Sequence, residues 1–334
     1  MRILGVAVLL LLVGCTPVVE PVETPEPTQT PVVEPLEIPA QPAQVFDGDC
    51  SAIFSGEALS AALGQQLTRP TPAFLAPFSA ASLEPETFLV EQVGGVRCNW
   101  AEPQPDPTVF TGFVLGVTAV PAFAVSAPED TECIATDISA TACPIDVTAN
   151  GIRLSGFVTS DAPGADKLAR VAAVEALFAE SATAAAAPVA QTPLPGAWQT
   201  PSDCGDLVAS VDWAALGAPD LQADESLGTD AYTSVVEMDL RGGRRLYTCW
   251  ASSDVLQLKF SLLGGGAWMQ DAVLAQDGAT VVDVPGLDLV VERPEVGTID
   301  IFDGVNWLQS FDYGDADAMY PALTAIVEAL DAAA

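Results

Sequence analysis

Apolar and polar positions recur in the same order in two stretches of the chain, 46–181 and 201–334. Each stretch opens near an Asp-Cys pair, followed by apolar residues at roughly helical spacing up to a Gly, over 49–64 in the first and 203–217 in the second. This pattern predicts a short amphipathic helix with a Gly C-cap at the start of each stretch. Because internal self-similarity indicates a repeated structural unit, we predict two copies of one module.

A Gly-Gly turn and a strand containing Cys and Trp follow each of these helices. In the first copy Cys98 and Trp100 alternate, so both side chains should lie on one face of the strand. In the second copy Cys249 and Trp250 are adjacent and would lie on opposite faces. Either a bulge restores the first arrangement or Trp250 packs elsewhere. The next strands are expected at about 108–117 and 255–263.

A hairpin is predicted near the end of each copy. Asn-Gly at 150–151 favours a two-residue turn because both positions need positive φ. Asp-Gly at 303–304 is the corresponding signal in the second copy, where the alternation is less regular and leaves the register open. In the first hairpin this turn sets Thr148 opposite Arg153, with one face buried and the other solvated. The buried face should hold Ile145, Val147, Ile152 and Leu154, and the solvated face Asp146, Thr148, Arg153 and Ser155.

An amphipathic helix is predicted at the end of each copy. Apolar residues fall near helical spacing over 168–178 and over 323–330. Pro321 is expected in the first turn of the second of these helices, where a missing N–H is tolerated. The predicted fold class is therefore α+β, with two tandem copies of a small antiparallel sheet and helices packed on each.

The first fifteen residues have a pattern of their own. Arg2 precedes an apolar run that is too short for a permanent membrane span, which predicts a secretory signal. The run ends in Leu-Val-Gly-Cys and resembles the lipobox of bacterial lipoproteins. The resemblance implies a lipoprotein signal peptide at 1–14, cleavage after Gly14, and a diacylglycerol on Cys15 that holds the chain on the extracytoplasmic face of the cell membrane. The alternative is an ordinary secretory signal that happens to contain a Cys.

Two segments lack apolar periodicity. Residues 15–45 begin with the predicted lipidated Cys and then repeat Pro among Glu, Thr and Val, which predicts a disordered, extended stalk. At about 3.1 Å per residue this stalk would reach roughly 90 Å when fully extended. The alternative is a Pro-rich ligand for a recognition domain. Residues 182–200 are rich in Ala and Pro and are expected to link the two modules.

The chain is strongly acidic and contains no His. It has 11 Lys and Arg against 45 Asp and Glu, which gives a formal net charge of −34. Such a charge repels nucleic acid and anionic lipid and suits a cationic partner, although acidic surfaces also keep exported proteins soluble. The lack of His removes the commonest general base and the commonest metal ligand.

Seven Cys are present, one of which is the predicted lipid attachment site. The remaining six, in an exported chain, predict three disulfides. Two pairs occupy corresponding places in the two copies, one Cys at the start of the first helix and one in the strand that contains Trp, and the remaining two must then pair together. The predicted disulfides are Cys50–Cys98, Cys204–Cys249 and Cys133–Cys143.

Several of these features together resemble a known family. The Asp-Cys start, a helix ending in Leu-Gly, the turn into Cys-x-Trp at 98–100 and Val-Pro-Gly-Leu at 284–287 resemble actinobacterial lipoproteins built on a domain of unknown function. That family is similar to the PsbP-like α/β sandwich, and some related domains are extracellular parts of receptor kinases. The resemblance implies an antiparallel sheet covered by helices and carries no catalytic residues over to this chain.

Few residues suggest chemistry, and each of them has a structural alternative. Three glycines form a weak phosphate-loop candidate without a following Lys, and a loop that joins a strand to a helix is the favoured interpretation. Three aspartates could ligate Ca²⁺ or cap a helix, and three tryptophans could line a carbohydrate or peptide site or pack in a core. These residues are Gly264, Gly265 and Gly266; Asp312, Asp315 and Asp317; and Trp213, Trp268 and Trp307.

The sequence favours a non-enzymatic, membrane-anchored binding or sensing protein of the cell envelope, without a cofactor. The anchor, the stalk, the duplication and the lack of a Ser-His or Cys-His pair support this hypothesis. The expected partners are the membrane, through the lipid, and an envelope protein or a cationic ligand, but no nucleic acid. The alternatives are an envelope hydrolase with paired carboxylates and a Ca²⁺-dependent adhesion module.

Overall fold

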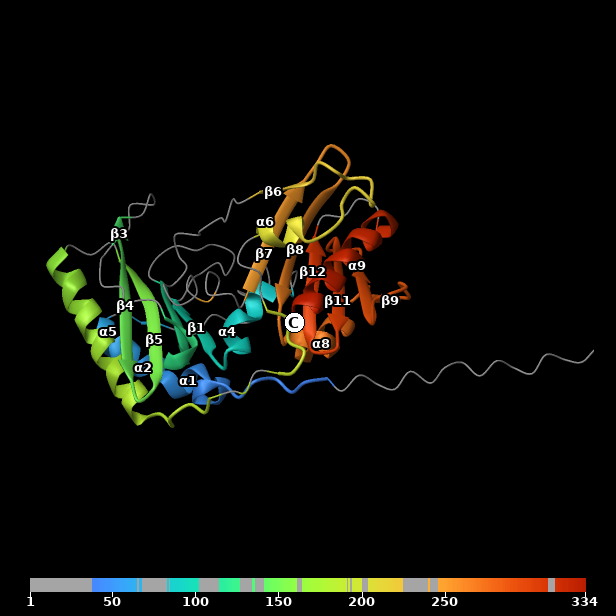
Figure 1. The fold of residues 1–334 in the computed structure, drawn as a ribbon. Coiled ribbons are helices and arrows are strands. Elements are labelled where there is room, and N and C mark those ends of the chain that lie inside the picture. Colours follow the sequence, from blue (N-terminus) through green and yellow to red (C-terminus); the bar gives the residue numbers. More distant parts are fainter. Residues whose placement is uncertain are drawn as a thin grey trace, which may run out of the picture. The chain divides into compact units, whose positions relative to one another are not determined.

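Two antiparallel β-sheets, one in each copy, form the framework of the computed structural model (Figure 1). Residues Glu37–Ala334 make up one structural unit that holds both sheets. The structure describes residues 38–64, 66–67, 83, 85–101, 114–126, 134–135, 141–160, 164–190, 192, 194–199, 204–224, 240, 246–311 and 316–334.

The first copy contains a five-stranded sheet in the order β1-β2-β5-β4-β3. Its strands are β1 (Val96–Ala101), β2 (Val114–Pro121), β3 (Ile134–Ala135), β4 (Thr141–Ala149) and β5 (Ile152–Ser160). Its helices and helical turns are η1 (Val45–Gly48), α1 (Cys50–Ile53), α2 (Gly56–Leu63), η2 (Pro85–Phe88), α4 (Leu89–Gln92), η3 (Ala122–Ala124) and α5 (Gly164–Ala184).

The second copy contains a seven-stranded sheet in the order β6-β7-β8-β12-β11-β10-β9. Its strands are β6 (Gln222–Asp224), β7 (Leu246–Ser252), β8 (Gln257–Leu263), β9 (Thr280–Val282), β10 (Leu289–Arg293), β11 (Thr298–Asp303) and β12 (Asn306–Phe311). Its helices are α6 (Cys204–Ala209), η4 (Gly266–Met269), α8 (Gln270–Leu274) and α9 (Ala316–Ala333).

The strand orders show the duplication directly. The series β1-β2-β5-β4 in the first sheet corresponds to β7-β8-β12-β11 in the second, and all neighbouring strands in both sheets are antiparallel. The second sheet is extended by β6 at one edge and by β9 at the other. The predicted α+β class, with two sheets and helices packed on them, is confirmed.

Two of the three predicted disulfides are present. Cys50, the first residue of α1, is bonded to Cys98 in β1, and Cys204, the first residue of α6, is bonded to Cys249 in β7. Each bond therefore ties the first helix of a copy to the corresponding strand of its sheet. Cys143 belongs to β4, but its predicted partner Cys133 lies outside the described residues, as does the predicted lipid site Cys15.

The tryptophans beside these cystines differ between the copies. Trp100 is 1% exposed and lies on the same buried face as Cys98. Strand β7 pairs with β8 in continuous register without a bulge, so Trp250 points away from buried Cys249 and is 45% exposed. The Nζ atom of Lys259, on the neighbouring strand, lies 4.8 Å from the centroid of the Trp250 ring. Of the two arrangements that the sequence allowed, the second is therefore correct.

The first hairpin has the predicted register but not the predicted solvation. The turn at 150–151 has positive φ at both residues, and Thr148 pairs with Arg153. The prediction of a solvated polar face holds for Thr148, which is exposed, but is wrong for Arg153 and Ser155, which are 5% and 2% exposed, and for the buried side chain of Asp146. Arg153 Nε donates to Asp146 Oδ1 at 2.9 Å, so the ion pair allows both charged side chains to be buried.

The sequence left the register of the second hairpin open, and the structure places its turn one residue after the start of the Asp-Gly signal. Asp303 pairs with Asn306, so the two-residue loop consists of Gly304 and Val305. Gly304 has a φ of 52°, and Val305 does not have positive φ. A Gly at the first turn position with an ordinary residue after it is the pattern of a type II′ turn.

The predicted helices are present with changed boundaries. The first is interrupted at Phe54 between α1 and α2, although Gly64 is the left-handed C-cap as predicted. In the second copy α6 already ends at Ala209, and Gly217 lies in a later turn. Pro321 is the sixth residue of α9 and not in its first turn, because this helix begins at Ala316.

Both ends of the predicted linker, residues 182–200, belong to the folded copies. Helix α5 continues to Ala184, and Ala182 is completely buried in the first core. Trp198 is 4% exposed and belongs to the core of the second copy. Its backbone N–H donates to Asn306 Oδ1 at 2.8 Å, and Asn306 Nδ2 donates to the Gly196 carbonyl oxygen at 2.9 Å. The end of the predicted linker is therefore fixed to the second hairpin.

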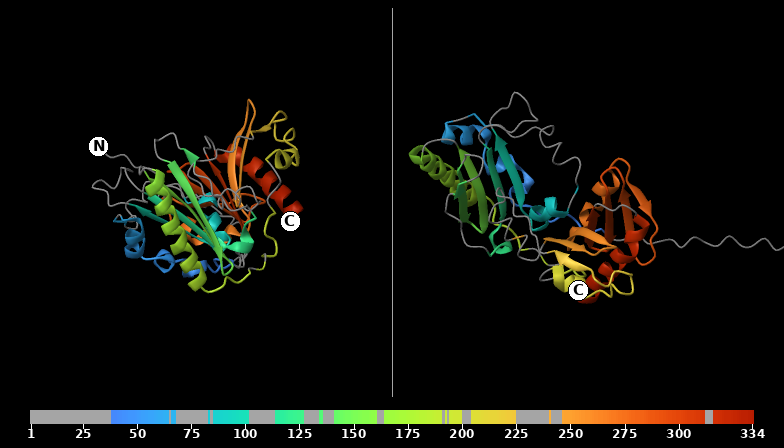
Figure 2. Two further views of the ribbon diagram at one scale, coloured as in Figure 1. Left: turned by 90° about the vertical axis from the view of Figure 1, so that its left-hand side faces the viewer. Right: turned by 90° about the horizontal axis from the view of Figure 1, so that it is seen from above.

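Three clusters of buried side chains hold the fold together. One lies between the first sheet and helices α1, α2 and α5, and includes Trp100. Another lies between the second sheet and helices α6 and α9, and includes Phe260. Figure 2 shows α5 against the first sheet and α9 against the second from two further directions. The third covers the opposite face of the second sheet, where Trp307 meets Leu89 and Val90 of α4 from the first copy.

Candidate functional site

The residues singled out in the sequence have structural roles wherever they are described. Trp213 and Trp307 are 6% and 0% exposed and belong to the cores, and Trp268 packs at the edge of the third cluster. Asp317 lies in the first turn of α9, while Asp312 and Asp315 fall outside the described residues. Within the described part of the chain, no group of three or more Cys, Asp or Glu residues is arranged to hold a metal ion.

Gly264 and Gly265 form the loop from β8 to η4 and Gly266 begins η4, as the structural alternative predicted. A Cβ atom on Gly264 would lie 2.4 Å from the backbone oxygen of Trp198, so only glycine allows this close approach. The backbone N–H of Gly265 donates to Asn306 Oδ1 at 3.2 Å. The glycines therefore allow the backbone around Trp198 to pack closely against this loop. We assign them this structural role in place of phosphate binding.

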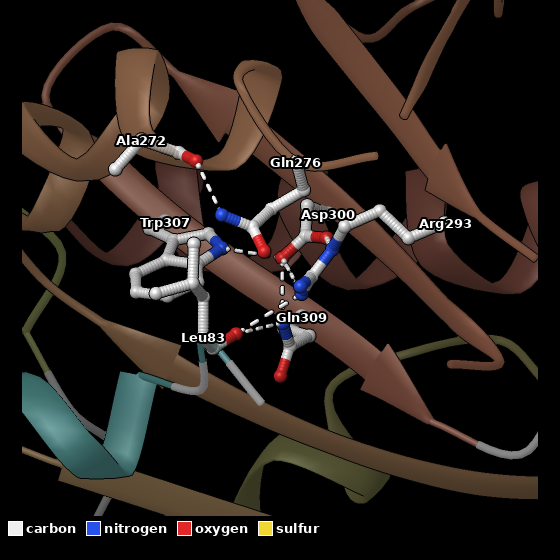
Figure 3. Close-up of polar contacts among 7 residues, drawn as sticks. All are labelled: Leu83, Ala272, Gln276, Arg293, Asp300, Trp307 and Gln309. Carbon is white, nitrogen blue, oxygen red and sulfur yellow. Dashed lines mark hydrogen bonds and ion pairs between the residues drawn. The ribbon is translucent and has the colours of Figure 1, made fainter. Parts of the chain in front are cut away.

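Among the described residues, a buried polar cluster on the second sheet most resembles a catalytic site. Asp300 on β11 accepts hydrogen bonds from Arg293 Nε at 2.7 Å, Trp307 Nε1 at 2.9 Å and Gln309 Nε2 at 2.7 Å. Arg293 Nη2 and Gln309 Nε2 also donate to the carbonyl oxygen of Leu83, at 3.0 and 2.6 Å. Figure 3 shows the four side chains converging on one point beside this carbonyl group.

The surroundings of this cluster give it a structural role. Asp300, Trp307 and Gln309 are completely buried, so a substrate would have no access to them. Burial raises the pKa of Asp300 above its ordinary range, and the Arg293 guanidinium and the two other donors oppose this shift. The hydrogen bonds to Leu83 attach a segment of the first copy to the sheet of the second. The cluster therefore acts as a polar staple between the copies.

Further contacts of the same segment support this interpretation. Trp268 Nε1 donates to Gln92 Oε1 at 2.7 Å, and Gln92 Nε2 donates to the Gly264 carbonyl oxygen at 3.1 Å. The Phe88 ring lies 5.8 Å from Trp268 and 6.1 Å from Trp307, measured between ring centroids. Leu83 and residues 85–92 are thus held on the second sheet by both polar and aromatic contacts.

Three carboxyl groups gather at the turn end of the second hairpin. Asp303 is hydrogen-bonded to Asp331 on α9 and to Asp288, which precedes β10. Burial, followed by the charge of Asp331, raises the pKa of Asp303 to about 7. Trp198 Nε1 donates to Asp331 Oδ1 at 2.7 Å. A proton on Asp303 therefore relieves the repulsion among these carboxylates.

We expect this group to make the protein less stable as the pH rises. A carboxyl whose pKa is higher in the folded than in the unfolded state contributes stability that is lost between the two values, here from 3.8 to about 7. Because Asp303 is partly exposed, the loss should be only roughly 1 kcal/mol. Chemical denaturation at pH 5 and pH 8 should show that Asp303→Asn stabilises the protein at pH 8 relative to pH 5. The exposed Asp271→Asn control should show no such dependence, and equal behaviour of the two variants would contradict the assignment.

A cleft of about 580 Å³ in the first copy is the best candidate for a binding site. Its walls come from the segment 43–47, from α1 and the start of α2, from the last two turns of α5 and from the segment 185–189. Phe46, Ile53, Phe54 and Leu177 contribute apolar surface to it. A cleft of this volume with a largely apolar lining is typical of ligand-binding sites.

Hydrogen bonds between distant segments fix the walls of this cleft. The Val45 backbone N–H donates to the Gly94 carbonyl oxygen at 2.8 Å. Ser181 Oγ on α5 donates to the Ile53 carbonyl oxygen on α1. Asn150 Nδ2, from the first hairpin, donates to the Ala185 carbonyl oxygen at 2.6 Å. The cleft is therefore built by tertiary contacts of the first copy.

One wall of the cleft contains a strained turn. Phe46 and Asp47 have φ angles of 54° and 52°, and Gly48 follows with a φ of 70°. Left-handed backbone in a residue other than glycine costs about 1 to 2 kcal/mol, and such strain is found preferentially at functional sites. The turn places the partly exposed Phe46 ring and the exposed Asp47 carboxylate at the cleft.

The residues of the cleft were not recognised as a site from the sequence. Phe46 and Asp47 lie at the boundary between the predicted stalk and the first module, and the wall at 185–189 lies inside the predicted linker. No motif connects these segments, because they come together only through the folding of α1 against α5. The exposure of Trp250, in contrast, could be inferred from the sequence. Trp250 directly follows a Cys that the repeat places in the core, and adjacent residues of a strand point to opposite faces.

Comparison of the chain with models of known protein families, with curated proteins and with solved structures finds no match. Among the helices of the described residues, none has both the length and the apolar character that crossing a bilayer requires.

Proposed function

We propose that this protein is a lipid-anchored, extracytoplasmic binding protein of the cell envelope, without an enzymatic activity of its own. The observation that carries the proposal is the pair of equivalent disulfides, Cys50–Cys98 and Cys204–Cys249, one in each copy. Structural disulfides of this kind persist in oxidising compartments outside the cytoplasm. The lipobox-like sequence before Cys15 supplies the anchor, and the Pro-rich segment after it supplies a spacer.

Two features of the described residues favour binding over catalysis. The polar cluster around Asp300 is buried and holds the two copies together, so its carboxylate and guanidinium are already engaged. The cleft beside Phe46 is accessible, and apolar side chains account for much of its lining. A lining of this composition suits the recognition of an apolar group. Its few carboxylates favour a ligand that also carries positive charge.

The anchor is tested by replacing Cys15 in the full-length chain. We expect the wild-type protein in the membrane fraction of a bacterial host, and Cys15→Ser in the soluble exported fraction, because a thioether to diacylglycerol requires the thiol. Incorporation of a radioactive fatty acid should be lost in the same variant. Thr16→Ala, next to the modified position, should retain both properties. Membrane retention of the Cys15→Ser variant would overturn the proposal.

A further inference from the structure

We propose that the cleft in the first copy binds a cationic amphipathic peptide segment, in which Lys or Arg side chains flank apolar ones. This inference rests on the proposed binding function and names the class of partner. It is carried by the shape of the cleft, the position of its charges and the composition of the chain around it.

The floor and walls of the cleft are suited to apolar side chains. Phe54 lines the cleft and is supported from behind by Trp100 and Phe178, with ring centroids 4.6 and 5.6 Å away. These rings form a rigid aromatic base, because they belong to the buried core of the first copy. At the outer wall Val189 is 83% exposed, which leaves an apolar side chain for a partner to cover.

The charges at the cleft are of one sign. Asp47 on the strained turn and Glu180 on α5 both line it and are both exposed, and its described lining contains neither Lys nor Arg. The formal net charge of −34 adds a long-range attraction for cations. An apolar group with a positive charge beside it therefore matches this site better than a neutral or anionic one.

The preceding segment of the same chain is a poor occupant of the cleft. Residues 16–37 contain five Glu residues and neither Lys nor Arg, so Asp47 and Glu180 would repel them. The partner is accordingly a different polypeptide with a basic, apolar segment. Exported proteins that carry such a segment in the cell envelope are the class that the cleft fits.

Binding is tested with the full-length protein and a short fluorescent peptide in which lysine and leucine alternate. Fluorescence anisotropy should report saturable binding that weakens with added salt. A peptide with glutamate in place of lysine should not bind, and one with glycine in place of leucine should bind at least about tenfold more weakly. Equal binding of the lysine and glutamate peptides would overturn the proposal.

Matched variants separate the cleft from the general negative charge. The double variant Asp47→Asn/Glu180→Lys should weaken binding about tenfold. The control Asp254→Asn/Asp271→Lys changes two exposed acids elsewhere by the same net charge and should weaken it less than about twofold. Asn is chosen at position 47 because it tolerates the left-handed backbone. Equal weakening by both double variants would show attraction to the whole chain and would contradict the proposed site.

Filling the cleft gives a second test that does not depend on charge. Ala184, at the end of α5, lines the cleft and is exposed, whereas Ala172 is exposed on the same helix away from it. Ala184→Trp should abolish peptide binding, and Ala172→Trp should leave it unchanged, with both variants retaining the wild-type melting temperature. Binding by Ala184→Trp at wild-type strength would contradict the proposal, while membrane attachment through Cys15 is scored separately and is unaffected by this result.

Discussion

Replacement of Asp300 by alanine is expected to lower the free energy of unfolding by about 3 to 5 kcal/mol. Arg293 is 3% exposed and loses its only described carboxylate partner in this variant. A guanidinium that remains buried without a counter-charge is costly, because the protein interior solvates it poorly. Trp307 Nε1 loses its acceptor in the same change. The loss should be measured by guanidinium chloride unfolding, followed by tryptophan fluorescence.

Two further variants test whether the unpaired charge is the cause. Removing both members of the pair, in Arg293→Met/Asp300→Leu, should cost less than Asp300→Ala, because no isolated charge stays buried. The exposed Asp271→Ala should change the free energy of unfolding by no more than about 0.5 kcal/mol. An Asp300→Ala variant that stays within about 1 kcal/mol of the wild type would contradict the role of the staple.

Removal of the Cys50–Cys98 bond should lower the free energy of unfolding by about 4 kcal/mol. The bond closes a loop between residues 48 positions apart, and the chain-entropy model gives about this value for such a loop. The double variant Cys50→Ala/Cys98→Ala should show the loss in chemical denaturation, and Cys204→Ala/Cys249→Ala, with a separation of 45, should show a similar one. Addition of a reductant should then cause a smaller further loss in each variant than in the wild type. A loss below about 1 kcal/mol in both variants would mean that these cystines do not brace the copies.

Much of the fold could be predicted because its signals are local and occur twice. The alternation of apolar residues and the turn at 150–151 determined the register that pairs Thr148 with Arg153. The recurrence of Asp-Cys and of Cys beside Trp identified both described disulfides without any knowledge of the sheets. The helix ending each copy followed from apolar spacing, and Leu323 and Leu330 are buried as that spacing requires.

The errors arose where a distant segment determines the environment of a residue. Arg153 was expected in solvent because it alternates with the apolar residues of the hairpin, but Asp146 provides the partner that permits burial. The register of the second hairpin could not be assigned from the sequence, and in the structure it places Asn306 where it binds the backbone around Trp198. A local sequence pattern contains no information on such long-range partners.

The sites were less predictable than the fold for the same reason. The staple joins Leu83 to Arg293 and Gln309, which are more than 200 positions away in the sequence. The cleft brings Phe46 next to α5 and to the segment 185–189. Trp307, which was considered for a carbohydrate site, instead completes the staple. Only the folded chain reveals which polar residues are buried in hydrogen bonds within the protein and which surface stays accessible.

The central claim is that a lipid on Cys15 holds the two cystine-braced copies outside the cytoplasmic membrane. Its most direct test is mass spectrometry of the N-terminal peptide of the protein extracted from membranes. We expect a mature chain that begins at Cys15 and carries the mass of a diacylglyceryl group. A mature chain with an unmodified Cys15, or one that begins at another residue, would contradict the claim.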